Sequence, residues 1–376
     1  MLIQIHMLQN YAPSNLNRDD TGSPKTAYFG GVQRGRISSQ CLKRSIRLSE
    51  TFEEAFKEDG LLAKRTKRLP GLIKEALKSL TDDEDVITAI VQRIPEIGAE
   101  SGRGKGKVEE DKPLETRQLI FIGANEAAPI AEKLLALYTE KGAKAWKSMK
   151  IAEITKALGR SVPGSVDIAM FGRMTTSDAF EDVQAAVQVA HALSANAVEQ
   201  EFDYFTAVDD LQPSADPGAG MIGDVEYNSS TYYKYINVHW DGLVKNLGGD
   251  VAVARQAVQA LLEAAAIAQP SGKQNTFAAH NLPDLILVEV REKNLPVSYV
   301  NAFIKPARQD FKHTLLDDAV AKLGEYMARI GTAYNLTEMD QRALMTTLTD
   351  TTLPQAEAQG SLSDLQEWLA GQLPEA

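Results

Sequence analysis

The 376-residue chain has a single cysteine, Cys41, which excludes an internal disulfide framework and is typical of a reducing compartment. Its N-terminus lacks the charged start and the long apolar run of a secretory signal. No stretch has the roughly 20 apolar residues that a membrane-spanning helix needs. These absences predict a soluble, cytoplasmic protein with no membrane partner.

Residue patterns that carry catalysis are scarce as well. The five histidines are scattered, with no pair at the spacing of metal ligands. Cys41 has neither a C-x-x-C partner nor a nearby histidine in sequence that would activate it. A G-x-S-x-G nucleophile motif and a kinase signature are both missing. We therefore expect no cofactor, no metal and no enzymatic activity.

Positive charge, in contrast, is concentrated in one stretch. The formal net charge is -11, yet the segment from Lys25 to Arg47 contains six cations and no Asp or Glu. An acidic protein with one basic stretch can bind a polyanion there and repel it elsewhere. With 44% hydrophobic and 24% charged residues, the chain is otherwise typical of a globular protein, and it is long enough for two or more packing units.

The second half of this basic segment has the pattern of a capped helix. Ser38-Ser39 supplies N-cap chemistry for a helix that begins near Gln40 and runs to about Ser49. At about 100° per residue, Leu42 and Ile46 fall on the inward face. The outward face then carries Gln40, Lys43, Arg44 and Arg47. A capped helix start suits phosphate, although a solvated basic face explains the same pattern.

A glycine turn at Phe29-Gly30-Gly31 and an extended Arg34-Gly35-Arg36 precede this helix. Together these features resemble the signature of the CasC-type backbone subunit of Cascade, the type I-E CRISPR surveillance complex. The matching residues are Asn17-Arg18-Asp19-Asp20, Lys25, Phe29-Gly30-Gly31, Arg36-Ile37-Ser38-Ser39-Gln40 and Leu42-Lys43-Arg44. The resemblance is weakest between about 50 and 165 and after Ala307.

Before and after the basic helix, the N-terminal half has three further expected segments. Residues 2–8 alternate as a half-buried strand, with Ile3, Ile5 and Met7 on one face and Gln4 and His6 on the other. Residues 9–35 have the composition of a long polar loop. The segment from about 50 to 165 is predicted to be helical, with a flexible loop at 102–107.

A lysine recurs every three residues in that helical segment. Lys141, Lys144, Lys147 and Lys150 form a slowly spiralling basic row, for which a solvated face is one explanation. In the resembling family this insertion is called the fingers, and its lysines guide DNA. The resemblance therefore makes the row a candidate DNA-binding site.

Further along, residues 166–170 alternate as a strand that leads into Gly172-Arg173-Met174. This block matches the family, in which the methionine lies beside the bound RNA bases, whereas a lone Met more often packs in a core. Residues 179–196 are expected to form a helix. Its buried stripe would comprise Val183, Val187, Ala190 and Leu193.

Two aromatic and β-branched segments, 202–212 and 227–240, predict an extended hairpin with a Pro- and Gly-rich tip. The block Phe205-Thr206-Ala207-Val208-Asp209-Asp210 matches the family's thumb, which inserts apolar groups between guide bases. Phe205 and Val208 occupy those positions, although cross-strand packing is the simpler explanation for Phe205.

The C-terminal half supplies a mostly buried helix at 251–269, a buried strand at 285–290 and a helix at about 363–369. Residues 273–279 and 296–303 match further family blocks. The expected fold is α+β, with an RRM-like (ferredoxin-like) palm, a helical fingers insertion and a β-hairpin thumb. The palm would comprise residues 1–50, 166–201 and 234–376, the fingers 51–165 and the thumb 202–233.

The resemblance implies a non-catalytic subunit that binds CRISPR guide RNA independently of sequence. Its copies would polymerise in a helical filament along the guide, with other Cascade subunits as partners, and the guide would pair with target DNA. The implied RNA-facing residues are Arg18, Asp20, Lys25, Ser38, Gln40, Lys43, Arg44, Arg47, Met174, Phe205, Thr206 and Val208.

Two alternatives stay open from the sequence. Asp19 and Asp20 could hold a divalent metal for ribonuclease chemistry, although bracing the loop through Asx turns is the simpler role. The chain could also be a general single-stranded RNA-binding protein without partners.

Overall fold

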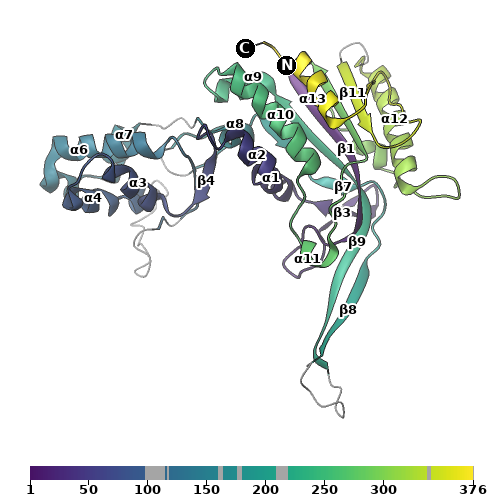
Figure 1. Cartoon of the computed structure of the whole chain (residues 1–376), viewed down its shortest axis with the longest axis horizontal. Coiled ribbons are helices and arrows are strands. Elements are labelled where there is room, and N and C mark those ends of the chain that lie inside the picture. Colours follow the sequence, from purple (N-terminus) through teal and green to yellow (C-terminus); the bar gives the residue numbers. More distant parts are fainter. Residues whose placement is uncertain are drawn as a thin grey trace. The chain divides into compact units, whose positions relative to one another are not determined.

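The computed structural model describes residues 1–97, 115–116, 118–159, 164–175, 180–208, 219–336 and 340–375. The chain forms two compact units, which are described separately below (Figure 1). The first unit comprises Met1–Phe52, Gln188–His239 and Val258–Pro374. The second comprises Glu53–Val187 and Trp240–Ala257. The predicted loop at 102–107 lies outside the described residues.

A mixed sheet is the centre of the first unit. Its strand order is β12-β11-β10-β1-β9-β7-β3-β2, and β6 and β8 also pair with β9. The strands are β1 (Leu2–Ser14), β2 (Thr26–Phe29), β3 (Val32–Ile37), β6 (Val187–Val189), β7 (Ala192–Ser194), β8 (Glu201–Val208), β9 (Ala219–His239), β10 (Leu285–Arg291), β11 (Asp340–Thr346) and β12 (Glu357–Gln359).

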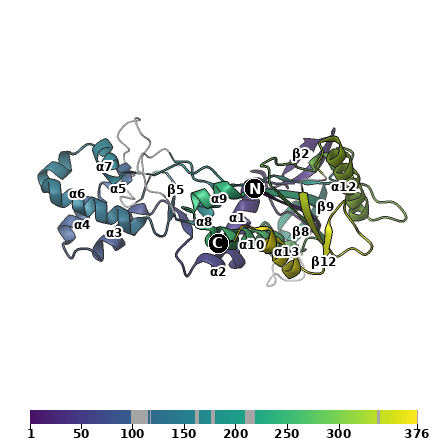
Figure 2. The ribbon, with the colours of Figure 1, turned by 90° about the horizontal axis from the view of Figure 1, so that it is seen from above.

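Helices cover both faces of this sheet (Figures 1 and 2). On one face, Leu323 and Met327 of α12 join a core with Leu287 of β10. On the other, α13 contacts β10 and β11, and its Gln366 donates a hydrogen bond to Glu263 of α10 over 3.2 Å. The helices are α1 (Ser39–Arg47), α10 (Val251–Ile267), α11 (Gln274–Phe277), η1 (Val300–Phe303), α12 (Leu315–Ala333) and α13 (Leu362–Gln372).

The first strand differs from its prediction. Burial does not alternate along β1, because Gln4 and His6 are as fully buried as the apolar residues between them. Both contact Glu289 of the neighbouring strand, at 3.1 Å from Gln4 Nε2 and 3.4 Å from His6 Nε2. Arg342 Nε and Tyr299 Oη also bond Glu289, at 2.7 and 2.8 Å. A buried polar layer, joined by hydrogen bonds and ion pairs to Glu289, therefore replaces the solvated face that the alternation indicated.

The expected polar loop over 9–35 is also shorter than predicted. β1 continues to Ser14, and β2 and β3 form an antiparallel pair whose register matches Phe29 with Val32. Gly30 and Gly31 make the turn between them, with φ values of 63° and 82°. The glycine turn and the extended Arg34-Gly35-Arg36 segment are confirmed.

One strand of the sheet extends into a hairpin. The C-terminal part of β9 pairs with β1 through the sheet, and its N-terminal part pairs antiparallel with β8, from Glu201↔Tyr227 to Val208↔Ala219. Figure 1 shows this arm extending beyond the sheet. β-Branched and aromatic residues in both segments favour this extended pairing.

Most of the second unit is helical. A core of aliphatic side chains, with Trp146 at 1% exposure, joins α3, α4, α6 and α7, which Figure 2 shows gathered together. Its elements are α2 (Glu50–Phe56), β4 (Ala63–Thr66), α3 (Leu69–Lys78), α4 (Glu84–Val91), α5 (Ile94–Ile97), β5 (Ile120–Gly123), α6 (Ala127–Ser148), α7 (Ile151–Leu158), α8 (Val166–Phe171) and α9 (Trp240–Asn246). The prediction of a helical segment is confirmed, apart from the β4–β5 pair.

Two predictions between 166 and 196 are wrong. Residues 166–171 form helix α8 rather than a strand. The local sequence fits a helix: Ser165 is at the N-cap position, Asp167 lies in the first turn, and Gly172 ends the helix with φ 80°. Residues 180–196, the described part of the helix predicted at 179–196, hold β6 and β7 instead. Pairing with β9 makes these residues strands. Val187 and Val189 are buried on either side of the exposed Gln188, which is the alternation of a strand with one buried face.

Candidate nucleic-acid interface

The start of α1 is fixed by three side chains from different parts of the first unit. The Cys41 N–H donates to Ser38 Oγ over 3.3 Å, which confirms Ser38 as the N-cap. The Ser38 N–H donates to Asn17 Oδ1 over 2.8 Å, and the Ser39 N–H donates to His191 Nδ1 over 3.1 Å. Burial and the cations Arg36 and Lys25 lower the pKa of His191, so the ring is neutral and accepts this bond at neutral pH.

Helix α1 presents its basic face as predicted. Leu42 and Ile46 are 5% and 3% exposed, so they anchor the helix. Gln40 and Arg44 are exposed on the opposite side, and Lys43 and Arg47 are partly exposed. Burial of part of its stem lowers the pKa of Lys43.

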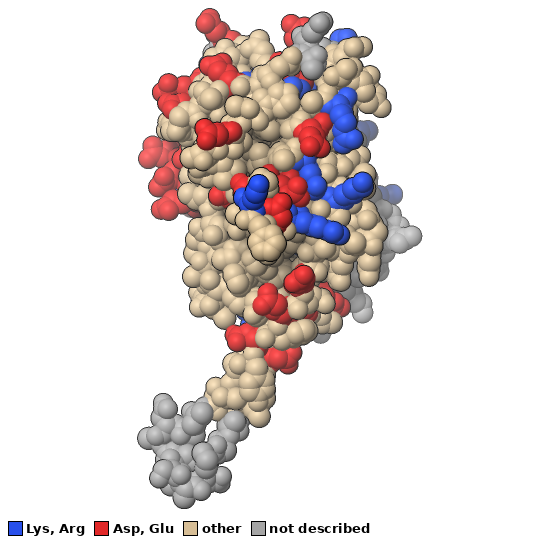
Figure 3. Space-filling view, turned by 90° about the vertical axis from the view of Figure 1, so that its right-hand side faces the viewer, with Lys and Arg blue, Asp and Glu red and all other residues tan. Residues whose placement is uncertain are grey.

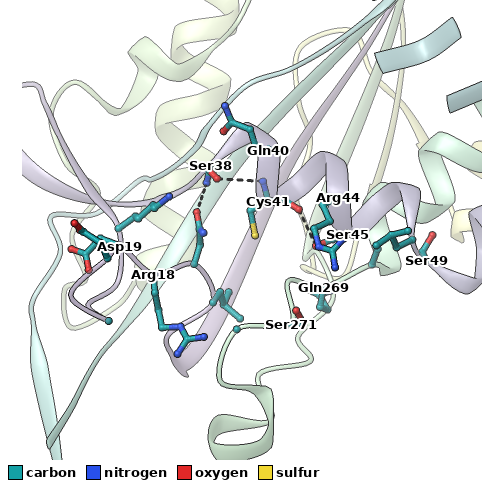
Figure 4. A pocket seen from close by; sticks show the side chains of 18 of the residues that line it. Arg18, Asp19, Ser38, Gln40, Cys41, Arg44, Ser45, Ser49, Gln269 and Ser271 are labelled. Carbon is teal, nitrogen blue, oxygen red and sulfur yellow. Dashed lines mark hydrogen bonds between the residues drawn. The ribbon is translucent and has the colours of Figure 1, made fainter. Parts of the chain in front are cut away.

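A pocket of about 1000 Å³ opens beside this face (Figure 4). Three segments line it: the loop at 16–25, one side of residues 38–49 in and beside α1, and residues 268–272. It brings together six predicted RNA-facing residues, namely Arg18, Asp20, Lys25, Ser38, Gln40 and Arg44. Lys43 and Arg47 do not line it. The pocket wall from 268–272 was not predicted, because only the tertiary fold brings that segment to the loop.

Close backbone packing holds this third wall in place. A Cβ on Gly272 would overlap the carbonyl of Leu16, so only glycine allows the two loops to touch. Gln269 also bonds the side chains of Gln9 and Tyr11 in β1. The walls of the pocket are thus attached to the central strand of the sheet.

The two carboxylates of the loop differ in their contacts. Asp19 Oδ1 accepts hydrogen bonds from the Thr21 N–H and hydroxyl, at 2.9 and 2.7 Å, and from the Ser23 N–H at 3.0 Å. These bonds, led by that of the Thr21 hydroxyl, lower the pKa of Asp19. Asp20 is exposed at the pocket. Within the described part of the chain, no three His, Cys, Asp or Glu side chains are grouped as metal ligands.

One cation of the basic segment belongs to the core. Arg34 is fully buried, and its guanidinium donates to the carbonyls of Ala195 and Phe303 over 2.7 and 2.6 Å. It also bonds the carbonyls of Phe29, Ser194 and Ile304. This side chain joins β3 to β7 and to η1, and burial lowers its pKa. The sequence alone did not distinguish it from the exposed cations around it.

The hairpin of β8 and β9 has a different character. Its exposed apolar side chains are Phe202, Tyr204, Phe205, Met221 and Ile222. Its described acids are Glu201, Asp203, Asp224 and Glu226, and the sequence has no Lys or Arg from 197 to 233. Figure 3 shows acidic side chains gathered near the base of this arm.

Such a surface is suited to bases rather than to phosphates, because carboxylates repel phosphates while exposed rings and aliphatic groups stack on bases. Phe205 is 39% exposed and packs over Gly223, where a Cβ would lie 2.6 Å from its ring. Thr206 is exposed and Val208 ends β8. Phe202 and Tyr204, which sequence analysis missed, are more exposed than Phe205, and their spacing of two residues along the strand was the available signal.

In the second unit, Met174 is 94% exposed. It is therefore not a core residue.

The lysine row in the second unit is not continuous: Gly142 interrupts α6 with φ 75°, and Lys150 lies at the N-cap of α7. All four lysines are exposed, and Lys141 pairs with Glu140 at 2.6 Å. The period of three therefore does not produce one basic stripe on one helix.

Sequence analysis overlooked a second basic cluster in this unit. Lys64, Arg65, Lys67 and Arg68 are all exposed, on β4 and the turn after it. Arg65 lies 5.2 Å from the ring centre of Phe121. The signal was available, since no Asp or Glu occurs between Asp59 and Glu75.

In the described residues no helix is both long enough and apolar enough to cross a membrane.

No curated protein matches the chain significantly. Among solved structures, it resembles a chain of a "CRISPR RNA-guided surveillance complex, pre-nicking", with 31% identity and a TM-score of 0.79 over 99% of this chain and 100% of that one. A chain of a "CRISPR RNA-guided surveillance complex" matches with 25% identity and a TM-score of 0.60 over 99% of each.

These likenesses confirm the predicted relationship to CRISPR surveillance proteins, and the α+β fold agrees with them. A family match spans almost the whole length, from residue 3 to residue 369. By that match, the chain belongs to the CT1975-like protein family.

Proposed function

We propose that this chain is the guide-RNA-binding backbone subunit of a type I-E Cascade complex, and that it is not catalytic. The observation that carries the proposal is the pocket beside α1, where Arg18, Lys25 and Arg44 converge with the N-cap of the helix. The likeness to chains of RNA-guided surveillance complexes supports the same conclusion.

The chemistry of the pocket supports binding to phosphates. The cations around it neutralise phosphate charge, with Lys43 and Arg47 on the same basic helix extending the surface. Ser38 and Gln40 lie at the start of α1, where the positive end of the helix dipole favours anions. Because such contacts do not touch base edges, the guide remains free to pair with target DNA.

The hairpin and Met174 supply the base contacts in this proposal. Phe205, Thr206 and Val208, together with the exposed rings of Phe202 and Tyr204, would lie against unstacked bases. The hairpin of one copy would cross the guide held by the next copy. Contact between different surfaces of identical chains extends a filament along the guide, alongside other Cascade subunits.

The strand order supports an RRM-like palm. Strands β1, β7, β9 and β10 stand in the order β10-β1-β9-β7, and α1 and α10 lie in the connections after β1 and after β9. That is the order of a ferredoxin-like βαββαβ sheet. In this proposal the palm comprises residues 1–50, 166–201 and 234–376, with fingers at 51–165 and a thumb at 202–233. The fingers lysines Lys141, Lys144, Lys147 and Lys150, and the β4 cluster, are the cations there that would face DNA.

The rival function is a metal-dependent ribonuclease that uses Asp19 or Asp20. The contacts of Asp19 favour a bracing role, since one of its oxygens already accepts three hydrogen bonds within the loop. Incubating the assembled complex with complementary RNA and Mg²⁺ separates the two functions. We expect intact RNA; periodic cuts that disappear in Asp20→Ala would establish the nuclease instead.

Expression together with a CRISPR transcript tests the main proposal. We expect a cytoplasmic ribonucleoprotein that contains one RNA of defined length and appears as a helical row of copies in electron micrographs. A chain that purifies without nucleic acid and stays monomeric when the transcript is supplied would refute it. A general RNA-binding protein would instead saturate RNA of any length.

A further inference from the structure

Adjacent residues in the second unit have opposite environments. Met174 is 94% exposed, whereas Arg173 is 4% exposed. A long apolar side chain in water next to a buried guanidinium reverses the usual distribution of these residue types. The reversal indicates that Arg173 anchors the segment from which Met174 projects.

The guanidinium of Arg173 contacts two other segments of the unit, residues 121–126 and 180–181. Its NH1 group lies 3.0 and 2.8 Å from the two carboxylate oxygens of Glu126, and both side chains are only 1% exposed. The same group donates to the carbonyl of Phe121 over 3.2 Å. Nε donates to the carbonyl of Glu181 over 3.0 Å, and the guanidinium lies 5.4 Å from the ring centre of Phe180. Glu126 is held in turn by the Gly123 N–H at 2.7 Å.

The backbone on both sides of Met174 is held as well. Arg173 and Val183 exchange two hydrogen bonds, of 2.9 and 2.8 Å. The Thr175 N–H donates to Asp182 Oδ1 over 2.7 Å. Gly172 turns the chain out of α8 with φ 80°, and a Cβ there would lie 2.9 Å from the Val183 carbonyl oxygen. Met174 is thus the exposed residue between two anchored neighbours.

We propose that the buried Arg173–Glu126 ion pair is a positioning device that holds Met174 as a fixed apolar wedge against nucleic-acid bases. Methionine is flexible and polarizable, so it conforms to a base face, but it can separate stacked bases only if its backbone does not yield. A buried ion pair breaks at high cost and therefore keeps that backbone in place. The nucleic-acid part of this inference rests on the proposed function, whereas the rigidity of the segment does not.

Spin labelling tests the rigidity without any RNA. Cys41→Ser gives a cysteine-free chain, into which Met174→Cys introduces one nitroxide site. Glu132→Cys, at an exposed position in α6, is the matched control in the same unit. Because the side chain at 174 is exposed, changes in the label's mobility report motion of the backbone. We expect the mobility at 174 to increase when Glu126→Gln or Arg173→Lys is added, with no change at 132.

Two variants are needed because either could disturb folding of the whole unit. Glu126→Gln keeps the shape and removes the charge, and Arg173→Lys keeps the charge and removes the planar fork. A label at 174 whose mobility is the same in the parent and in both variants overturns the inference.

The assembled complex tests the action on bases. Guides carrying 2-aminopurine at successive positions report unstacked bases by increased fluorescence. We expect a periodic pattern in the parent, loss of its maxima in Met174→Ala and the same loss in Glu126→Gln, with Glu132→Ala, at an exposed position in α6, as an unaffected control. A pattern that persists in Glu126→Gln overturns the positioning role, whereas a parent that binds no guide contradicts the proposed function instead.

Discussion

The guanidinium of Arg34 donates a 2.6 Å hydrogen bond to the main-chain carbonyl of Phe303, 269 residues away in the sequence. Arg44, ten residues later in the same basic segment, is exposed beside the pocket. Two arginines that are alike in the sequence therefore have different environments: Arg34 is bonded inside the core, and Arg44 is exposed at the pocket.

Arg34→Met is expected to lower the free energy of unfolding by at least about 3 kcal/mol, because it leaves several buried carbonyls without a donor. Arg44→Met should change it by less than about 0.5 kcal/mol, as is usual for an exposed side chain. Urea denaturation followed by circular dichroism measures both. Equal midpoints for the two variants would contradict the structural role of Arg34.

Charge reversal at Lys43 and Arg44 together should weaken guide binding at least tenfold, since a hydrogen bond to a charged group contributes about 1.5 kcal/mol or more. The reduction should be the same for every guide sequence. The slope of log K against log salt should decrease by about 0.7 for each phosphate that the protein no longer neutralises. Filter binding over a salt series measures this.

Lys78→Glu, at an exposed i,i+3 pair with Glu75 in α3, is the matched control for that double variant. It should leave the affinity and the salt slope unchanged. A charge-reversed α1 that altered sequence preference would argue against the assignment of these cations to phosphates.

Gly30→Ala should destabilise the protein more than Gly31→Ala. Both residues have positive φ, which costs an alanine roughly 1 kcal/mol. At Gly30 the new Cβ would also overlap the carbonyl of Ile304, whereas nothing lies within 4 Å of a Cβ at Gly31. Urea midpoints of the two variants measure the difference, and a larger effect at Gly31 would show that the contact between the β2–β3 turn and Ile304 is dispensable.

Lys234 makes stability depend on pH. It is 3% exposed in β9, its ammonium lies 5.9 Å from the ring centre of Tyr11, and burial lowers its pKa from 10.5 to about 7. Above the unfolded pKa the amine is neutral in both the folded and the unfolded state, so its burial does not lower the free energy of unfolding. As the pH falls from 10.5 towards 7, the unfolded chain binds the proton first. The free energy of unfolding therefore decreases progressively over this range.

Lys234→Met is therefore expected to be more stable than the parent at pH 7, by on the order of a few kcal/mol. The difference should shrink as the pH rises towards 10. Urea midpoints of both proteins at several pH values measure it, and subtraction of the two curves removes the titration of other groups. A difference that does not depend on pH would contradict the assignment.

The sequence by itself determined the elements whose signals are local. The helix at 39–47 was predicted with its cap and its buried residues, because Ser38, Leu42 and Ile46 act within a few positions of one another. The buried strand at 285–291 and the helices at 251–267 and 362–372 were evident for the same reason. The relationship to CRISPR surveillance proteins was recognised from short motifs, which also need no tertiary contact.

The tertiary structure decided everything that depends on partners distant in sequence. The spacing of Val183 and Val187 fits a helix, yet hydrogen bonding to β9 makes β6 and β7 strands of the sheet. Gln4 and His6 have the polarity of a solvated face, yet Glu289 compensates for their burial. Arg34 and Arg173 are cations like any others in the sequence, and become structural because carbonyls and a carboxylate from other segments surround them. A hydrogen bond compensates for desolvation only where both partners meet, and the fold alone determines where that happens.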